Sequence, residues 1–188
     1  MPPRNADEAG FDGLHDLPTI EHRLAEIARA KADDVAAQLL TVTSRAETSG
    51  RVIIAADTAI VVAAADGLVH VIGQPPADDS WRATVRRWFV DCYAGRTHVA
   101  LTALCVRDGK GTSVERIVKS EVTFIPDVER HLEWYIRTGE PRGKAGGYAI
   151  QGAGSIFISK VTGSLSNVVG LPLEALLDAF EELQVDIT

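Results

Sequence analysis

The chain has 188 residues and a formal net charge of −7; 46% of its residues are hydrophobic and 24% are charged. This length and composition predict one globular domain over residues 1–188, or two closely packed lobes, with a sizeable core. The acidic charge disfavours nonspecific binding to nucleic acid. No segment approaches the roughly 18 apolar residues of a membrane span, and the first residues lack an apolar signal region, which predicts a cytoplasmic protein.

The first part of the chain predicts a long helix followed by a strand hairpin. Hydrophobic residues recur at helical spacing from Thr19 to about Leu40, with Thr19 placed as the N-cap. A dense β-branched run at residues 51–62 then precedes a second short run at residues 68–72, with an Ala-Asp-Gly turn between them. We expect these two runs to pair.

The rest of the chain continues to alternate helices with strands. One helix carries Trp81, Val85, Trp88, Phe89 and Cys92 on one face. The further predicted strands are residues 97–106, 113–124 and 155–161, and the predicted helices are residues 79–95, 126–138 and 173–183. The alternation predicts an α/β fold with a mixed central sheet and flanking helices.

The cysteines and one histidine are expected to be structural. Cys92 and Cys105 have neither zinc-like nor CxxC spacing, and both fall in apolar patterns, which predicts reduced thiols in the core. His98, at the start of a strand, could titrate near neutral pH but is more typical of a structural residue. Because no paired histidines occur, any metal would be a hard cation such as magnesium on carboxylates and phosphates.

Asp57 is the most informative single residue. It lies inside the β-branched run, where an isolated carboxylate is costly to bury, so we expect a partner, a metal ion or a raised pKa. Two interpretations stay open: a satisfied aspartate at a strand bulge, and a general base or metal ligand. Lys31 interrupts the apolar face of the first helix, and it either extends to solvent or points into a polar cleft.

The stretch at residues 143–152, GKAGGYAIQG, contains four glycines and Lys144. It is not a Walker A loop, because Ala145 stands where a magnesium-binding hydroxyl is needed, and it is not a dinucleotide fingerprint. The glycines permit close approach of the backbone to an anion, although a flexible surface loop is the alternative. Gln151, after a short apolar run, offers an amide to a base or a water molecule.

Four motifs occur in a compatible order and spacing. They are Ala56-Asp57-Thr58, Gly95-Arg96-Thr97-His98, the GKAGGYAIQG loop and Ser166-Asn167-Val168-Val169-Gly170-Leu171-Pro172-Leu173. Together they resemble the Maf family of nucleoside triphosphate pyrophosphatases, from about Asn5 to the C-terminus. The resemblance implies a two-lobed α/β fold, with a long mixed sheet and a nucleotide cleft between the lobes.

The resemblance also implies a reaction. Maf enzymes cleave nucleoside triphosphates between the α- and β-phosphates, which yields a monophosphate and pyrophosphate, and they use a divalent cation such as Mg²⁺ or Mn²⁺. Asp57 matches the aspartate that is taken as the base activating water. Lys31 and Lys144 match lysines of the phosphate-binding region.

Three further residues are assigned through the same resemblance. Glu8 matches an acidic position ahead of the first helix, with a metal or catalytic contribution. Thr58 and Gln151 resemble the branch that acts on dTTP, UTP and modified uridine triphosphates. The expected partner is thus a nucleoside triphosphate, with no nucleic acid or membrane, and a homodimer is a further expectation.

Two features depart from the family pattern. The family opens with a strand and a Ser-x-Ser-Pro-Arg-Arg phosphate loop, whereas this chain begins Met1-Pro2-Pro3-Arg4. We therefore expect the full-length protein to extend N-terminally, and the 188 residues alone to be inactive or barely active. Gln74 stands where the family has the lysine of Gly-Lys-Pro, so that position supplies no charge.

Three functional hypotheses stay open. The first is a pyrimidine-acting pyrophosphatase, at least in its full-length form. The second is a nucleotide-binding or regulatory relative that keeps the cleft but has lost turnover. The third is a Maf enzyme with another base preference, such as 7-methyl-GTP, whose branch tends to carry Gln and Glu at the positions of Thr58 and Gln151.

Overall fold

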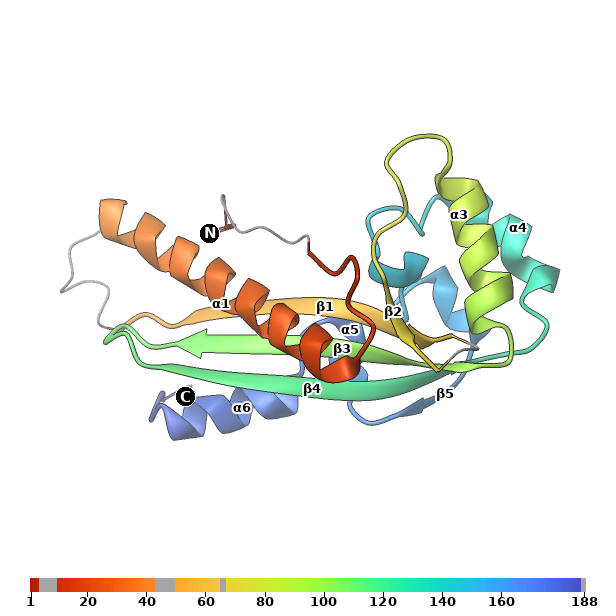
Figure 1. The fold of residues 1–188 in the computed structure, drawn as a ribbon. Helices are drawn as coiled ribbons and strands as arrows, with labels where there is room; N and C mark the ends of the chain where they lie inside the picture. Colours follow the sequence, from red (N-terminus) through yellow and green to blue (C-terminus); the bar gives the residue numbers. More distant parts are fainter. Residues whose placement is uncertain (4–9, 43–49, 65–66, 187–188) are drawn as a thin grey trace.

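A computed structural model describes residues 1–3, 10–42, 50–64 and 67–186. Five strands form one sheet in the order β2-β1-β3-β4-β5 (Figure 1). They are β1 (Ile53–Ala63), β2 (Val69–Ile72), β3 (Thr97–Arg107), β4 (Ser113–Phe124) and β5 (Ile158–Thr162). The predicted α/β class is confirmed. A mixed sheet was expected, but every strand pairing in the described residues is antiparallel. Each connection between neighbouring strands therefore reverses the direction of the chain.

Helices cover both faces of this sheet. Helix α1 (Leu17–Val42) lies along one face, over β1 and β3, and α5 (Leu165–Val169) and α6 (Leu173–Glu182) pack on the other (Figure 1). Helices α3 (Trp81–Arg87) and α4 (Glu129–Thr138) pack together beyond the end of the sheet that carries β2 and β5. None of the helices in the described ranges is long and apolar enough to cross a membrane.

The N-terminus of α1 differs from the sequence prediction. The helix begins at Leu17, and the side chain of Asp16 accepts a hydrogen bond from the backbone N–H of Thr19 at 2.9 Å. Asp16 is therefore the N-cap, and Thr19 lies inside the first turn. The hydrogen bonds from the Thr19 hydroxyl and backbone lower the pKa of the Asp16 carboxyl.

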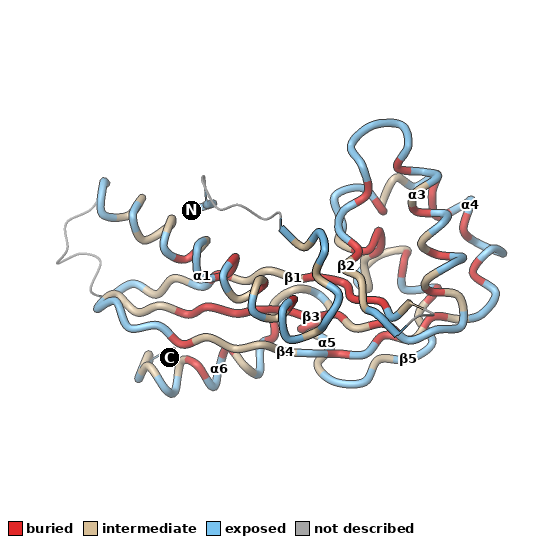
Figure 2. The backbone as a smooth tube through the Cα atoms, in the orientation of Figure 1, coloured by how far each residue is buried: buried red, intermediate tan, exposed pale blue. Residues whose placement is uncertain are grey.

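The strand alternation of β1 divides the core into two sides. Ala55, Ala59 and Val61 pack with the apolar face of α1. Ile60 and Val62 pack instead with the aromatic cluster beneath α3 and α4. Because side chains alternate along a strand, the odd-numbered residues of β1 face α1 and the even-numbered residues face the other side. Buried residues accordingly follow the middle strands between the two layers (Figure 2).

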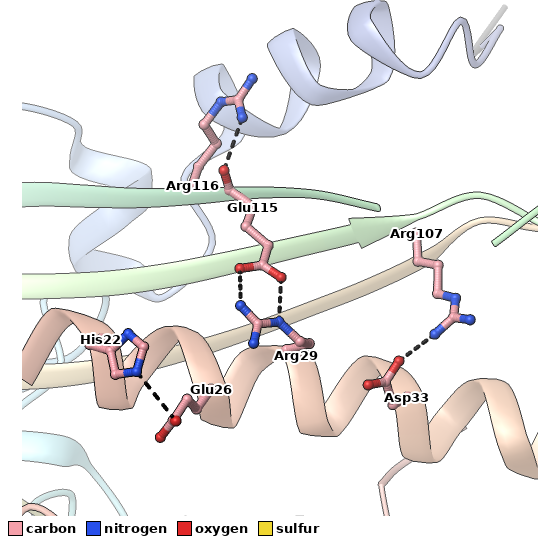
Figure 3. A network of polar contacts seen from close by, with 7 residues as sticks. All are labelled: His22, Glu26, Arg29, Asp33, Arg107, Glu115 and Arg116. Carbon is pink, nitrogen blue, oxygen red and sulfur yellow. Dashed lines mark hydrogen bonds and ion pairs between the residues drawn. The ribbon is translucent and has the colours of Figure 1, made fainter. Parts of the chain in front are cut away.

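Ion pairs connect α1 to the strands beneath it (Figure 3). The guanidinium of Arg29 donates to both carboxylate oxygens of Glu115 on β4, at 2.6 and 2.7 Å, and it lowers the pKa of that carboxyl. Arg107, at the end of β3, pairs with Asp33. Each partly exposed pair contributes only about 0–1 kcal/mol, so their main effect is to set the position of α1 on the sheet.

Among the described residues, four local elements were not predicted, and one of them is a 3₁₀ turn, Ala145–Gly147, in the glycine-rich loop. The helix at residues 79–95 continues from α3 into a π-helix, Trp88–Tyr93, and Tyr93 is fully buried. A 3₁₀-helix, Ala153–Phe157, precedes β5, which therefore begins at Ile158. The motif at residues 166–173 overlaps the short helix α5, which begins one residue before it.

The cysteine prediction is confirmed for Cys105. Both cysteines are free thiols; Cys105 is buried in β3, and Cys92 is half-buried in the π-helix. Burial raises the pKa of the Cys105 thiol to about 11, so this group stays a neutral core residue at physiological pH.

Candidate functional site

Lys31 and Asp57 form an ion pair between α1 and β1. The Lys31 Nζ donates to the Asp57 Oδ1 at 2.7 Å, and only 13% and 16% of the two side chains are exposed. The expectation that Asp57 has a partner is confirmed, and Lys31 points inward rather than out to solvent. Because the pair is largely shielded from water, its electrostatic interaction is stronger than that of an exposed pair.

Thr58 projects from the opposite face of β1, since it follows Asp57 directly along the strand. Its hydroxyl hydrogen-bonds the hydroxyl of Thr102 on β3 at 2.9 Å. Thr102 in turn donates to the backbone carbonyl of Asn167 at 3.4 Å. Either threonine hydroxyl can donate in the Thr58–Thr102 bond. When Thr102 donates its one proton to Asn167, Thr58 donates to Thr102 and its oxygen keeps acceptor capacity.

Asn167 anchors α5 to the sheet below Thr58. Its side chain is fully buried, and the Nδ2 donates to the carbonyl of Ala100 and the hydroxyl of Ser120, each at 3.0 Å. The helix ends at Gly170, whose φ of 116° favours glycine, and a Cβ placed there would lie 3.6 Å from the Thr58 hydroxyl oxygen. The sequence motif at residues 166–173 includes Asn167, but its spacing did not indicate that the Asn167 side chain would be buried and hydrogen-bonded to the sheet.

A cavity of about 230 Å³ lies between Thr58, the glycine-rich loop and α5. Its lining residues are Thr58, Ile60, Gly143, Lys144, Ala145, Tyr148, Ala149, Ile150, Gln151, Val168, Val169 and Gly170. The fold thus brings Thr58, Lys144 and Gln151, three of the predicted site residues, to one hollow. Its lining combines polar and apolar groups in similar measure, and convergent polar groups of this kind fix the orientation of a ligand in small-molecule sites.

Buried hydroxyls hold the glycine-rich loop against the core. The Tyr93 hydroxyl donates to the carbonyl of Gly146 at 3.0 Å, and the Tyr135 hydroxyl donates to the carbonyl of Gly147 at 3.2 Å. A Cβ on Gly146, where φ is 72°, would lie 2.7 Å from Ile60. Glycine is therefore required for both conformation and space, and the alternative of a flexible surface loop does not describe this segment.

His98 supports the same loop from below. Its Nε2 hydrogen-bonds the Tyr148 hydroxyl at 2.7 Å, and the ring is only 2% exposed. Burial lowers the pKa of His98 to about 3 and raises that of Tyr148 above its usual value, so both groups are neutral at physiological pH. The structural interpretation of His98 is therefore the one that the geometry favours.

The predicted residues fall into two groups. Lys31 and Asp57 lie on the α1 face of β1, whereas Thr58, Lys144 and Gln151 surround the cavity on the other face. Glu8 lies outside the described residues. No group of three potential metal ligands occurs among the residues that the structure describes.

The outer edge of β1 separates these two groups. Strand β2 pairs only with residues 60–63 of β1, while β3 pairs with residues 53–61 on the inner side. Within the described ranges, no strand pairs with the outer edge at residues 53–59. Asp57 and Thr58 therefore lie at a strand edge from which both faces of the sheet are reached.

Gln74 follows the end of β2 and is exposed. Its neighbour Gly73 accepts a hydrogen bond from the backbone N–H of Gly146 at 2.9 Å, which joins this turn to the glycine-rich loop. The turn is thus part of the framework of the cavity, although Gln74 brings no charge to it.

Comparison with known proteins places this fold and these motifs in one family. The family model described as "Maf-like protein" matches residues 3–183. The "dTTP/UTP pyrophosphatase" of Anaeromyxobacter dehalogenans strain 2CP-1 is 42% identical over 127 residues, which cover 66% of this chain and 60% of that protein. A protein of the same name from Anaeromyxobacter sp. strain Fw109-5 is 37% identical over 176 residues, or 91% of this chain and 72% of the relative.

The similarity also reaches proteins with a broader name. The "Nucleoside triphosphate pyrophosphatase" of Xylella fastidiosa strain M23 is 40% identical over 133 residues, which cover 69% of this chain and 65% of that protein. The matched part of this chain spans 60% of the first relative's length and 72% at most among these three. With the family model matching nearly its full length, the chain belongs to the Maf family.

Proposed function

We propose that the whole protein is a nucleoside triphosphate pyrophosphatase that hydrolyses dTTP, UTP or modified pyrimidine nucleotides to the monophosphate and pyrophosphate. The observation that carries the proposal is the cavity that gathers Thr58, Lys144 and Gln151 at a strand edge beside Asp57 and Lys31, in a member of the Maf family. The names of its relatives support the same activity.

In this proposal the pyrimidine base occupies the cavity. Uracil and thymine each present an N–H between two carbonyls, so they need an acceptor and donors in one plane. The Thr58 oxygen, with its proton directed to Thr102, supplies an acceptor, and the Gln151 amide supplies both types of group. The apolar residues of the cavity lining cover the ring.

The triphosphate then extends across the outer edge of β1 towards the other face. Lys144 attracts it from the glycine-rich loop, and Lys31 from α1. Asp57 accepts a proton from water, and the water oxygen forms a bond to the α-phosphorus. The bond from this phosphorus to the oxygen bridging the β-phosphate breaks, and pyrophosphate leaves with that oxygen. The lysines offset the negative charge that develops.

A divalent cation suits the residues of this edge. Mg²⁺ is commonly bound by one or two carboxylates together with substrate phosphates and water, and Asp57 is a carboxylate at the proposed phosphate position. When bound, such a cation would neutralise charge on the phosphate oxygens and so make the α-phosphorus easier to attack. The assignment of Glu8 as a second acidic ligand stays a prediction, as does the homodimer.

The proposal is tested with a panel of UTP, dTTP, GTP and 7-methyl-GTP. Calorimetry measures binding to the 188-residue chain, and a pyrophosphate assay with Mg²⁺ or Mn²⁺ measures turnover. Tighter binding of UTP and dTTP, with release of pyrophosphate, supports the proposal. The same measurements are made on the whole protein. Binding without turnover there indicates the nucleotide-binding relative, and a preference for 7-methyl-GTP indicates the other branch. No binding of any nucleotide by the whole protein contradicts the proposal.

A further inference from the structure

Glu140 is a loop residue whose two carboxylate oxygens each accept a hydrogen bond from the backbone. It lies two residues after α4 ends and is half-buried. Its Oε2 accepts from the N–H of Ala153 at 2.7 Å, and its Oε1 accepts from the N–H of Gly154 at 2.8 Å. Hydrogen bonds to a carboxylate are about twice as strong as bonds between neutral groups, so this is a firm connection between two loops.

These two N–H groups belong to the first residues of the 3₁₀-helix, which begins two residues after Gln151. The carboxylate therefore fixes the backbone immediately behind the residue that lines the cavity. Glycine at residue 152 leaves room for the Glu140 carboxylate, because a Cβ there would lie 2.4 Å from the Oε2. A side chain at residue 152 would displace either the carboxylate or the loop.

Helix α4 also holds the other end of the loop, at Gly147. Tyr135, one turn before the end of α4, donates its hydroxyl to the carbonyl of Gly147. A Cβ on Gly154 would lie 3.0 Å from the same hydroxyl oxygen, so Tyr135 also packs against the second backbone group that Glu140 binds. Tyr135 and Glu140 thus hold the two ends of residues 147–154, with Gln151 between them.

We propose that Glu140 is a positioning residue that sets the base selectivity of the site by holding Gln151 in the wall of the cavity. The inference deepens the proposed function and rests on it. Glu140 does not touch the nucleotide in this arrangement, since both of its oxygens are directed at backbone N–H groups. Its effect passes through the backbone of residues 151–154.

The test is a double-mutant cycle of Glu140→Gln and Gln151→Ala in the full chain. The readout is the ratio of the UTP and GTP dissociation constants, measured by calorimetry. In Glu140→Gln the side-chain NH₂ faces one of the two backbone N–H groups. Because two donors cannot form a hydrogen bond, one bond is lost, and we expect the UTP preference to fall about tenfold. The double variant should be no less selective than Gln151→Ala alone, because Glu140 acts through Gln151.

Two controls separate positioning from general stability. Glu133→Gln, on α4, removes only the exposed ion pair with Arg86 and should leave selectivity unchanged. Hydrogen exchange at the amides of Ala153 and Gly154 should be faster in Glu140→Gln, which is a readout that needs no nucleotide. If Glu140→Gln does not fold, Glu140→Asp, whose shorter side chain loses at least one of the two bonds, takes its place in the cycle.

Additive effects in the cycle, or a lowered melting temperature with unchanged selectivity, would overturn the inference. A whole wild-type protein that binds no nucleoside triphosphate would overturn the proposed function and this inference with it. The two failures are distinguishable, because in the first the wild-type protein prefers UTP and only the role of Glu140 is lost.

Discussion

The two faces of β1 carry opposite kinds of chemistry at adjacent residues. On the α1 face, Asp57 and Lys31 bring two charges together in a largely shielded ion pair. On the other face, Thr58 begins a chain of neutral groups that continues through Thr102 to Asn167. One strand therefore presents a charged group and a neutral hydroxyl to opposite sides of the sheet.

In the proposed function, this difference separates the residues of the reaction from those that recognise the base. A charge pair stabilises developing charge and moves protons, but it discriminates poorly between neutral rings. A set of fixed neutral donors and acceptors discriminates strongly, because a ligand with the wrong pattern leaves a buried group unpaired. We therefore expect variants on the α1 face to change the rate, and variants on the cavity face to change the choice of base or the stability of the fold.

The largest effect is expected from Asp57→Asn. Removing the carboxylate should lower the rate of pyrophosphate release by about 10²–10⁴-fold, as is common for general bases, while nucleotide affinity changes little. Pyrophosphate release, calorimetry and circular dichroism measure the three quantities. Thr58→Val is the matched variant on the opposite face, and it should change the UTP-to-GTP preference more than the rate. If Asp57→Asn unfolds instead, the aspartate is structural.

The next largest effect is the loss of stability at acidic pH that we expect from His98. The pKa of His98 is about 3 in the folded protein and about 6.5 in an unfolded chain. Below pH 6.5 the unfolded chain therefore binds a proton that the folded protein does not, so stability falls as the pH is lowered. The loss should be about 1.4 kcal/mol per pH unit between pH 6.5 and 3.

Chemical denaturation at several pH values checks this sign and slope. His98→Gln removes the titration and keeps a hydrogen-bonding group near Tyr148, so its stability should depend less steeply on pH in this range. Equal slopes for the wild type and the variant would show that His98 does not cause the acid sensitivity.

A smaller effect is expected from Asn167→Ala. The variant removes the two hydrogen bonds from Nδ2 to the Ala100 carbonyl and the Ser120 hydroxyl, and a hydrogen bond of this kind contributes about 1 kcal/mol. We expect a loss of about 2 kcal/mol in the free energy of unfolding, measured by urea denaturation. Ser159→Ala removes one exposed bond to the Thr123 carbonyl and should cost less than about 0.5 kcal/mol.

The smallest effect on stability is expected from Lys31→Met. The variant removes the ammonium beside Asp57. Because the Asp57 carboxylate is 16% exposed, water can rehydrate it in part, and about 1 kcal/mol of stability should be lost. Arg86→Met breaks the exposed pair with Glu133 and should cost less. If Lys31→Met is no more destabilising than Arg86→Met, the shielding of the Lys31 pair has no energetic consequence.

Much of the fold could be predicted, because hydrophobic periodicity reports which face of an element is buried. Helix α1, the hairpin of β1 with β2 and the hairpin of β3 with β4 each follow from such patterns. The relative direction of strands that are distant in the sequence could not be predicted, since it depends on the path of the segments that connect them. Short elements such as α5 were missed because five residues carry too little periodicity.

The site was predicted in part. The partner of Asp57 could be anticipated, because a buried carboxylate needs one. The separation of Asp57 from Thr58 could have been inferred from strand alternation, which sends adjacent side chains to opposite faces. Glu140 carried no sequence signal, since its role depends on two backbone groups that lie 13 and 14 residues away along the chain.

The π-helix has a consequence for how this chain tolerates changes in length. Trp81, Val85, Phe89 and Tyr93 are all buried and follow one another at intervals of four residues. In a regular α-helix each such interval turns the side chain by about 40° around the axis, so the fourth would drift away from the core. The wider turn at Trp88–Tyr93 reverses that drift and returns Tyr93 to the carbonyl of Gly146. Deletion of a single residue here would misalign the helix with the loop, even though exposed positions such as Val90 should accept many substitutions.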